Sequence, residues 1–172
     1  MNTIASVNID IEYYSIKPHH FLDYLYDLGI GYRHDGEINV NGNRNGELCR
    51  KFIDGEMKKI KFTPFVDDIC RPCKKLLEGK RCADYFDDET MIYYGFRYKD
   101  DFNYQLDLKL NSALPDVFCF DKIWDMSELL FVLKKGLTEE VINLYKWNRP
   151  ERAKNTFSGI EKGKRIYKLL IH

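Results

Sequence analysis

The chain has 172 residues, which suits one domain of ordinary size. A domain of this length buries roughly two thirds of the surface that its unfolded chain exposes, so a metal is not needed to form a core. Basic and acidic residues number 27 each, and the whole molecule therefore has no strong field for nucleic acid or an anionic membrane. We expect neither as a partner and leave a protein partner open.

The N-terminal stretch MNTIASVNIDIEYY has no basic run followed by an apolar core, and Asp10 and Glu12 do not fit a signal peptide. No apolar run approaches the ~20 residues of a membrane helix. We therefore expect a cytoplasmic protein. In that reducing compartment five cysteines, an odd number, are not a disulfide framework, and clustered thiols indicate metal or redox chemistry.

The first half of the chain predicts one strand and two helices. Residues 7–13 alternate apolar and polar side chains, which is typical of a strand with one buried face. A helix should begin at Pro18 and end at the Gly-Ile-Gly of residues 29–31. Three further segments follow: an asparagine-rich loop at 39–46, an amphipathic helix at 48–57 and a short extended segment at 59–65.

Helices dominate the second half. Residues 102–114 fit both a strand and a helical face, and we favour a helix because the helical pattern continues for one more turn. Asp125 and Thr138 are predicted helix caps, and a final basic helix follows at 153–170. The sequence thus predicts an α+β fold, a mainly helical single domain over residues 1–172 with a small N-terminal β element and a cysteine-rich metal loop.

Three of the five cysteines lie within thirteen positions, in the stretch DDICRPCKKLLEGKRCADYF at residues 67–86. Cys70 and Cys73 form a Cys-x-x-Cys, whose spacing lets both sulfurs turn toward one ion, and Cys82 follows nine residues after Cys73. Basic neighbours in this stretch would stabilise thiolates. These residues predict a metal site, with zinc or an iron–sulfur cluster as the occupant.

A closed tetrahedral zinc site needs a fourth ligand, and His19 or His20 can supply it from the helix that begins at Pro18. Asp23 is a competitor, because it shares a helix face with both histidines. It could ligate the metal or accept a hydrogen bond that orients an imidazole.

Other interpretations of these residues stay open. Cys70 can be an ordinary buried thiol, with the histidines hydrogen-bonded near a helix start, or Cys70 and Cys73 can form a redox dithiol, although the βαβ setting of such a motif is missing. The acid pair at 67–68 can be a base or ligand, but before a loop it is more often a turn and cap device. Cys49 and Cys119 fit the core. The chain carries no other catalytic signature, and the catalytic residues are not predicted.

Several motifs resemble, in order, those of the small prokaryotic proteins of domain of unknown function family 1284, which are described as iron–sulfur binders. They are KPHHFLDYLYDLGIGY at 17–32, DDICRPC at 67–73 with a later cysteine, LDLKLNSAL at 106–114, and a late tryptophan followed by GIEKG at 159–163. The resemblance covers most of the chain, and the first two motifs are the specific ones. It adds weight to a metal site and to iron–sulfur over zinc, but it implies no reaction.

The chain departs from the family pattern at several cysteine positions. Asp23 stands where the family has its first cysteine, and if Trp147 is the late tryptophan, the terminal cysteines are replaced by Ile142, Tyr145 and Ala153. The residues that carry over are His19, His20, Cys70, Cys73 and Cys82, with Asp23 as a changed ligand. The sequence therefore predicts a metal-binding protein, enzymatic or not. The alternative is a metal-free binding or regulatory protein that has lost an ancestral cluster.

Overall fold

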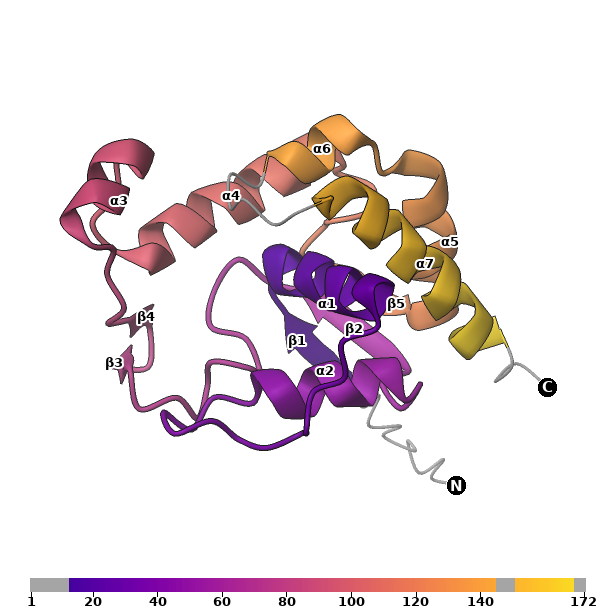
Figure 1. Cartoon of the computed structure of the whole chain (residues 1–172), viewed down its shortest axis with the longest axis horizontal. Coiled ribbons are helices and arrows are strands. Elements are labelled where there is room, and N and C mark those ends of the chain that lie inside the picture. The colour runs from indigo at the N-terminus through magenta and orange to yellow at the C-terminus, as the bar shows by residue number, and fades with distance from the viewer. Residues whose placement is uncertain (1–12, 145–150, 169–172) are drawn as a thin grey trace, which may run out of the picture.

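The fold is built around helix α1 (Pro18–Ile30), which lies near the centre of the computed structural model (Figure 1). Pro18 supplies a fixed φ for the first turn, and Gly31 ends the helix with a φ of 76°. Phe21, Leu22 and Leu25 are buried and join the hydrophobic core. The structure describes residues 13–144 and 151–168.

Helices outweigh a small mixed sheet in this α+β fold. The other helices are α2 (Asn45–Ile53), α3 (Asp88–Tyr94), α4 (Lys99–Ala113), α5 (Met126–Gly136), α6 (Glu139–Asn143) and α7 (Arg152–Lys168). The strands are β1 (Tyr14–Ile16), β2 (Lys59–Phe62), β3 (Leu76–Leu77), β4 (Arg81–Cys82) and β5 (Ile123–Asp125).

Strand β2 is the centre of the three-stranded sheet. It pairs in parallel with β1, where Ile16 faces Phe62, and antiparallel with β5, where Ile60 faces Trp124. All four of these side chains are buried, so the sheet contributes one face to the core.

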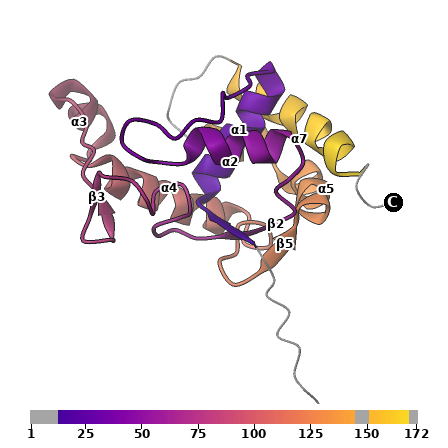
Figure 2. The ribbon, with the colours of Figure 1, turned by 90° about the horizontal axis from the view of Figure 1, so that it is seen from below.

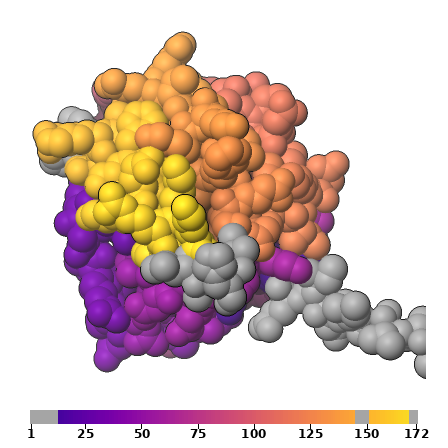
Figure 3. Space-filling model, turned by 90° about the vertical axis from the view of Figure 1, so that its right-hand side faces the viewer, coloured from indigo at the N-terminus to yellow at the C-terminus, as the bar shows by residue number. Residues whose placement is uncertain are grey.

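Helix α7 packs along α1 with their backbones in close contact. A Cβ added at Gly159 would collide with the Leu25 carbonyl, and one added at Gly29 would collide with the carbonyl of Asn155. Glycine is therefore required on both helices for this approach. In the space-filling view, α7 lies between the surface of α5 and α6 and the N-terminal part of the chain (Figure 3).

The hairpin β3–β4 and helix α3 lie at the end of the molecule opposite α7, in both views of the ribbon (Figures 1 and 2). The first pairing of the hairpin joins Leu76 to Cys82. Asp87 caps α3 by accepting a hydrogen bond from the Thr90 N–H at 2.8 Å. The clustered cysteines thus lie between this end and the N-terminus of α1.

Most predicted helices are confirmed, including the one at Pro18, the helix rather than strand at 102–114, and the caps at Asp125 and Thr138. The predicted second helix is wrong at both ends: α2 begins at Asn45 and ends at Ile53, because Gly55 adopts a φ of 76°. The predicted strand at 7–13 lies outside the described residues except for Tyr13, which precedes β1.

The final helix is confirmed as α7, and the last predicted positions, 169–170, lie outside the described residues. None of the helices in the described part of the chain has the length and apolar character that a membrane crossing requires.

Candidate metal centre

The three clustered cysteines line one cavity of about 380 Å³, together with two of the three predicted residues of α1. The five are Cys70, Cys73, Cys82, His20 and Asp23. Helix α1, the segment from 69 to 84 and the start of α4 all contribute to the wall. The structure thus brings together five of the six residues that the sequence singled out.

His20 is held at the wall by a buried carboxylate. Its Nδ1 lies 2.7 Å from Oδ2 of Asp67, which is fully buried. Burial on its own lowers the pKa of His20, but the Asp67 carboxylate outweighs this effect and raises the pKa. When a carboxylate accepts a hydrogen bond from one ring nitrogen, it fixes the orientation of the imidazole and leaves the other nitrogen available to bind a metal. This is the usual arrangement at histidine–metal sites.

Asp67 also organises the cysteine turn. One oxygen accepts the Lys17 backbone N–H at 3.0 Å, and the other accepts the Cys70 N–H at 3.0 Å. Burial raises the pKa of Asp67, but His20 and these hydrogen bonds together bring it below the ordinary value of 3.8. Asp67 of the acid pair therefore caps the cysteine turn, and the same carboxylate joins the start of α1 to the cysteines.

His19 does not line the cavity, although its ring lies beside that of His20, with 4.2 Å between the ring centroids. It is buried, and its Nδ1 lies 2.9 Å from both oxygens of Asp107 in α4, which also accepts the His19 backbone N–H at 2.9 Å. Burial lowers the pKa of His19 well below 6.5 and raises that of Asp107 to about 8. The pair keeps a net charge of zero, and His19 serves the packing of α1 on α4.

Burial and neighbouring charges shift the pKa values of Cys70 and Cys82. Burial raises the pKa of Cys70, the Asp67 carboxylate adds to the effect, and the Lys17 ammonium opposes it. Burial also raises the pKa of Cys82. Lys17 is only 4% exposed, and its Nζ donates to Asp100 at 3.0 Å, so a fixed positive charge lies beside the Cys70 thiol.

Asp23 lines the cavity and forms an ion pair with Arg152 of α7, with 3.3 Å between Oδ1 and Nη1. This contact joins the wall of the cavity to the C-terminal helix. The Arg152 partner was not predicted, because it lies 129 residues away in the chain.

Five asparagines form much of the remaining wall: Asn39, Asn41, Asn43, Asn45 and Asn103. The first three belong to the loop before α2, which is joined to the cysteine turn by two backbone hydrogen bonds. The Lys74 N–H donates to the Asn41 carbonyl at 2.7 Å, and the Arg44 N–H donates to the Ile69 carbonyl at 3.1 Å. The alternation of asparagines at 39, 41, 43 and 45 is the sequence signal for this wall, but the composition alone predicts only a loop there.

The spacing of the thiols distinguishes between metal centres. Four ligands around one zinc ion, with Zn–S bonds of about 2.3 Å, place the sulfurs about 3.8 Å apart. Among the described residues, the group of three whose ligand atoms lie within 4.8 Å of one another is Asp27, His34 and Cys49, and no three ligand atoms of the cavity meet that limit. The described cavity therefore does not hold three ligand atoms at the spacing of a single zinc ion.

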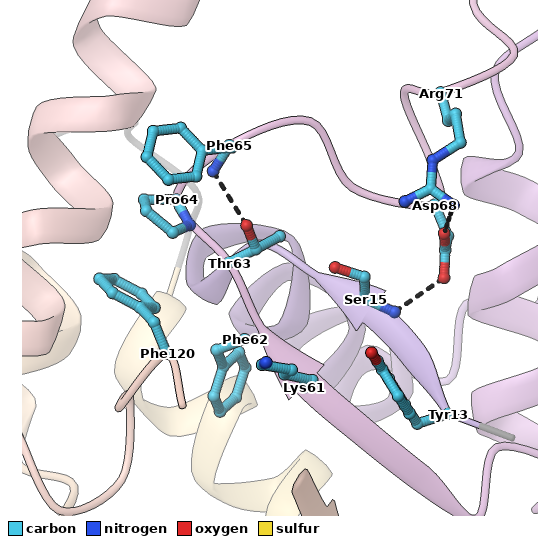
Figure 4. Close-up of a pocket in the computed structure, with 10 residues that line it drawn as sticks. All are labelled: Tyr13, Ser15, Lys61, Phe62, Thr63, Pro64, Phe65, Asp68, Arg71 and Phe120. Atoms are coloured by element: carbon cyan, nitrogen blue, oxygen red, sulfur yellow. Dashed lines mark hydrogen bonds and ion pairs between the residues drawn. The ribbon is translucent and has the colours of Figure 1, made fainter. Parts of the chain in front are cut away.

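A second cavity, of about 450 Å³, lies on the other side of the turn at 68–71 (Figure 4). Phe62, Phe65 and Phe120 line one part of it, and the carboxylate of Asp68 lies in another part. That carboxylate already accepts the Ser15 backbone N–H at 2.7 Å and binds a guanidinium at 3.0 Å. The described lining residues include no cysteine or histidine, so this cavity is not the candidate centre.

The sequence singled out Asp67 but did not predict its contact with His20, and it gave no signal for Asp107 or for the burial of Lys17. Cys49 is buried, as predicted, and Cys119 is partly buried against the core. The resemblance to family 1284 stays a prediction. The chain matches no protein-family model, no curated protein and no solved structure.

Proposed function

We propose that this chain binds an iron–sulfur cluster in the cavity at the start of α1, with Cys70, Cys73 and Cys82 as thiolate ligands and His20 as the fourth protein ligand. One observation carries the proposal: the three clustered cysteines line the same cavity as a histidine from a separate part of the sequence, whose Nδ1 is held by a buried carboxylate. A cysteine-rich metal loop at 67–86 is part of the same proposal.

The dimensions of the site support a cluster over a single zinc ion. The cavity measures about 380 Å³, and no three of its ligand atoms, among the described residues, lie within 4.8 Å of one another. A cluster spreads its thiolates over several irons, so its ligands stand farther apart than those of one tetrahedral ion. The resemblance to family 1284 supports the same choice.

The charges around the thiols also support a bound centre. Thiolates, not thiols, bind metals, and the buried Lys17 ammonium lies where it stabilises the Cys70 thiolate. Metal binding then supplies the remaining positive charge and displaces the thiol protons. All five cysteines are free, which fits the cytoplasmic location that we propose.

The chemistry that such a centre supplies depends on the fourth ligand. If His20 binds iron, the cluster is closed by protein ligands and is suited to electron transfer. If His20 instead faces a substrate, one iron stays open to the cavity and acts as a Lewis acid. The asparagines and Lys75 and Lys99 on the wall would bind a small polar molecule at that position.

A second candidate is a metal-free binding or regulatory protein. Two observations favour it: Asp23 stands where the resembling family has a cysteine and is paired with Arg152, and burial keeps the pKa of Cys70 high. In this case the cavity binds a polar ligand without a metal, and the cysteines contribute only to packing.

The test is the iron and sulfide content of full-length variants purified without oxygen. Cys82→Ser should lose most of the bound iron and the broad visible absorption of the cluster, because it removes one of three thiolates. Cys119→Ser is the matched control, since Cys119 is also a partly buried free cysteine but does not line the cavity. Equal iron in both variants contradicts the proposal, and stoichiometric zinc lost only in Cys82→Ser would assign the site to zinc.

A further inference from the structure

A second group of metal-ligating side chains lies toward the C-terminal end of α1. Asp27 belongs to α1, His34 to the loop that follows it, and Cys49 to α2. One ligand atom of each side chain lies within 4.8 Å of the other two. The three residues belong to three successive segments of the chain, and neither Cys49 nor His34 stands in a motif that predicts a metal.

The group is compact and shielded from solvent. Nε2 of His34 lies 3.1 Å from Oδ2 of Asp27, and the two side chains are 17% and 13% exposed. Cys49 is fully buried beneath them. The site thus combines a buried thiol with an imidazole and a carboxylate that are largely shielded from solvent.

The backbone brings His34 back onto α2. Gly31 turns the chain in a left-handed conformation, and the Tyr32 N–H donates to the Asp27 carbonyl at 2.9 Å. Gly46 of α2 lets the loop lie directly on the helix, because a Cβ there would come within 3.0 Å of the Glu37 carbonyl oxygen and 3.7 Å of His34 Nδ1. The position of His34 is therefore set by the fold.

We propose that Asp27, His34 and Cys49 bind a zinc ion, with water as the fourth ligand. A mixture of thiolate, imidazole and carboxylate is the ligand chemistry of zinc. Bonds of about 2.0 Å to oxygen and nitrogen and about 2.3 Å to sulfur place tetrahedral ligands about 3.3 to 3.5 Å apart. The imidazole and the carboxylate already have nearly this separation, at 3.1 Å. The thiol lies within 4.8 Å of both and needs a shift of about 1.3 Å at most.

The charges at this site favour a cation. The Asp27 carboxylate has an oxygen within 4.8 Å of the Cys49 sulfur. A divalent cation offsets the negative charges of this carboxylate and of the thiolate, and it takes the place of the thiol proton.

A zinc ion here would fix the loop between α1 and α2 at its first half. The second half of the same loop carries Asn39, Asn41 and Asn43, which line the cysteine cavity. The ion would therefore stabilise one wall of the proposed cluster site without contacting it. This zinc site does not depend on the proposed function, because the two sites share no ligand.

The test is a titration of metal-free full-length protein with Co²⁺, whose absorption reports thiolate coordination. The background is the triple variant Cys70→Ser, Cys73→Ser, Cys82→Ser, in which the cavity has no thiols. We expect about one Co²⁺ per chain with a sulfur-to-cobalt charge-transfer band. Adding Cys49→Ser should abolish the band, whereas adding Cys119→Ser, the matched control, should leave it unchanged.

His34→Gln in the same background provides a second test that does not alter the core. It should weaken Co²⁺ binding by at least about tenfold, since even groups that only orient metal ligands contribute about 10- to 100-fold to affinity. Circular dichroism verifies that each variant is folded. A triple variant that binds no Co²⁺, or a band that survives both Cys49→Ser and His34→Gln, overturns the proposal, whatever the cavity binds.

Discussion

The imidazole Nδ1 of His20 lies 2.7 Å from Oδ2 of Asp67, a carboxylate with no exposed surface. The same carboxylate accepts the backbone N–H groups of Lys17 and Cys70. One side chain therefore sets the orientation of the candidate histidine ligand, the first turn of α1 and the cysteine turn. The arrangement of the site therefore depends on Asp67 at three positions at once.

Asp67→Asn should destabilise the metal-free protein by about 3 kcal/mol, because it removes one member of a buried ion pair and leaves His20 without its acceptor. Denaturant unfolding measures this change. Asp68→Asn is the matched control: its side chain is more exposed and pairs with Arg71 at the surface, so we expect a change below about 1 kcal/mol. Equal effects of the two substitutions would show that Asp67 does not have the special role assigned to it.

The same substitution should weaken the metal centre. Groups that orient a metal-bound histidine typically contribute about 10- to 100-fold to metal affinity. Asp67→Asn should therefore lower iron occupancy after anaerobic purification, while Asp68→Asn retains it. Full occupancy in Asp67→Asn would mean that His20 is not a ligand.

The pair of His19 and Asp107 predicts a specific pH dependence of stability. Burial lowers the pKa of His19 well below 6.5 and raises that of Asp107 to about 8, so the folded pair keeps one proton up to about pH 8. In the unfolded chain both groups have lost their protons above their ordinary values of 3.8 and 6.5. Between about pH 6.5 and 8 the folded state holds one more proton, and stability falls by up to about 1.4 kcal/mol per pH unit.

Asp107→Asn isolates this contribution. In this variant, stability should no longer fall between about pH 6.5 and 8 because of the His19–Asp107 pair. It should instead fall as the pH drops below about 6.5, because His19 then takes up a proton in the unfolded chain but not in the folded protein. The raised pKa of His20, which the Asp67 carboxylate causes against the effect of burial, adds a decline of the same sign to both proteins. Parallel curves of unfolding free energy against pH for the two proteins would contradict the assignment.

The sequence predicted the elements that depend on local signals. Pro18 and Gly31 define α1, and Asp125 caps α5, because each acts on its own turn. The end of α2 was wrong for a physical reason. Met57 continues the apolar pattern and is buried, but Gly55 turns the chain before it, so the same burial is reached outside the helix.

The site was only partly predictable. The cysteine spacing and the nearby histidines identified the thiols and the ring that now line one cavity. The carboxylates that bind those rings are 47 and 88 residues away, so no local pattern connects them. Asp27, His34 and Cys49 were missed for the same reason, because three separate elements bring them together.

Asp23→Cys should create a fourth thiolate in the cavity. Asp23 lines the same space as Cys70, Cys73 and Cys82, and in the resembling family a cysteine stands at this position. We expect the cluster of this variant to survive longer in air, measured as the half-life of its visible absorption, because a fourth thiolate can replace the His20 imidazole and complete the usual set of four cysteine ligands. Asp23→Ser is the control for the loss of the ion pair with Arg152. A half-life no longer than that of Asp23→Ser would place residue 23 out of reach of the centre.

Gly159→Ala should destabilise the fold by about 3 kcal/mol. Its Cβ would collide with the Leu25 carbonyl at the crossing of α1 and α7, where neither backbone can move without disturbing the core. Gly136→Ala is the matched control, because a Cβ there has only an ordinary contact of 3.6 Å with Leu114. It should be neutral or slightly stabilising in thermal unfolding. A similar loss of stability in both variants would contradict a close contact between the two helices.

The iron and acid-labile sulfide content of the full-length chain, purified without oxygen or chelator, shows directly whether the protein binds a cluster. We expect a brown protein with iron and sulfide in equal molar amounts, whatever zinc it also contains. Protein without iron or sulfide, including protein that contains zinc alone, would contradict the proposed cluster.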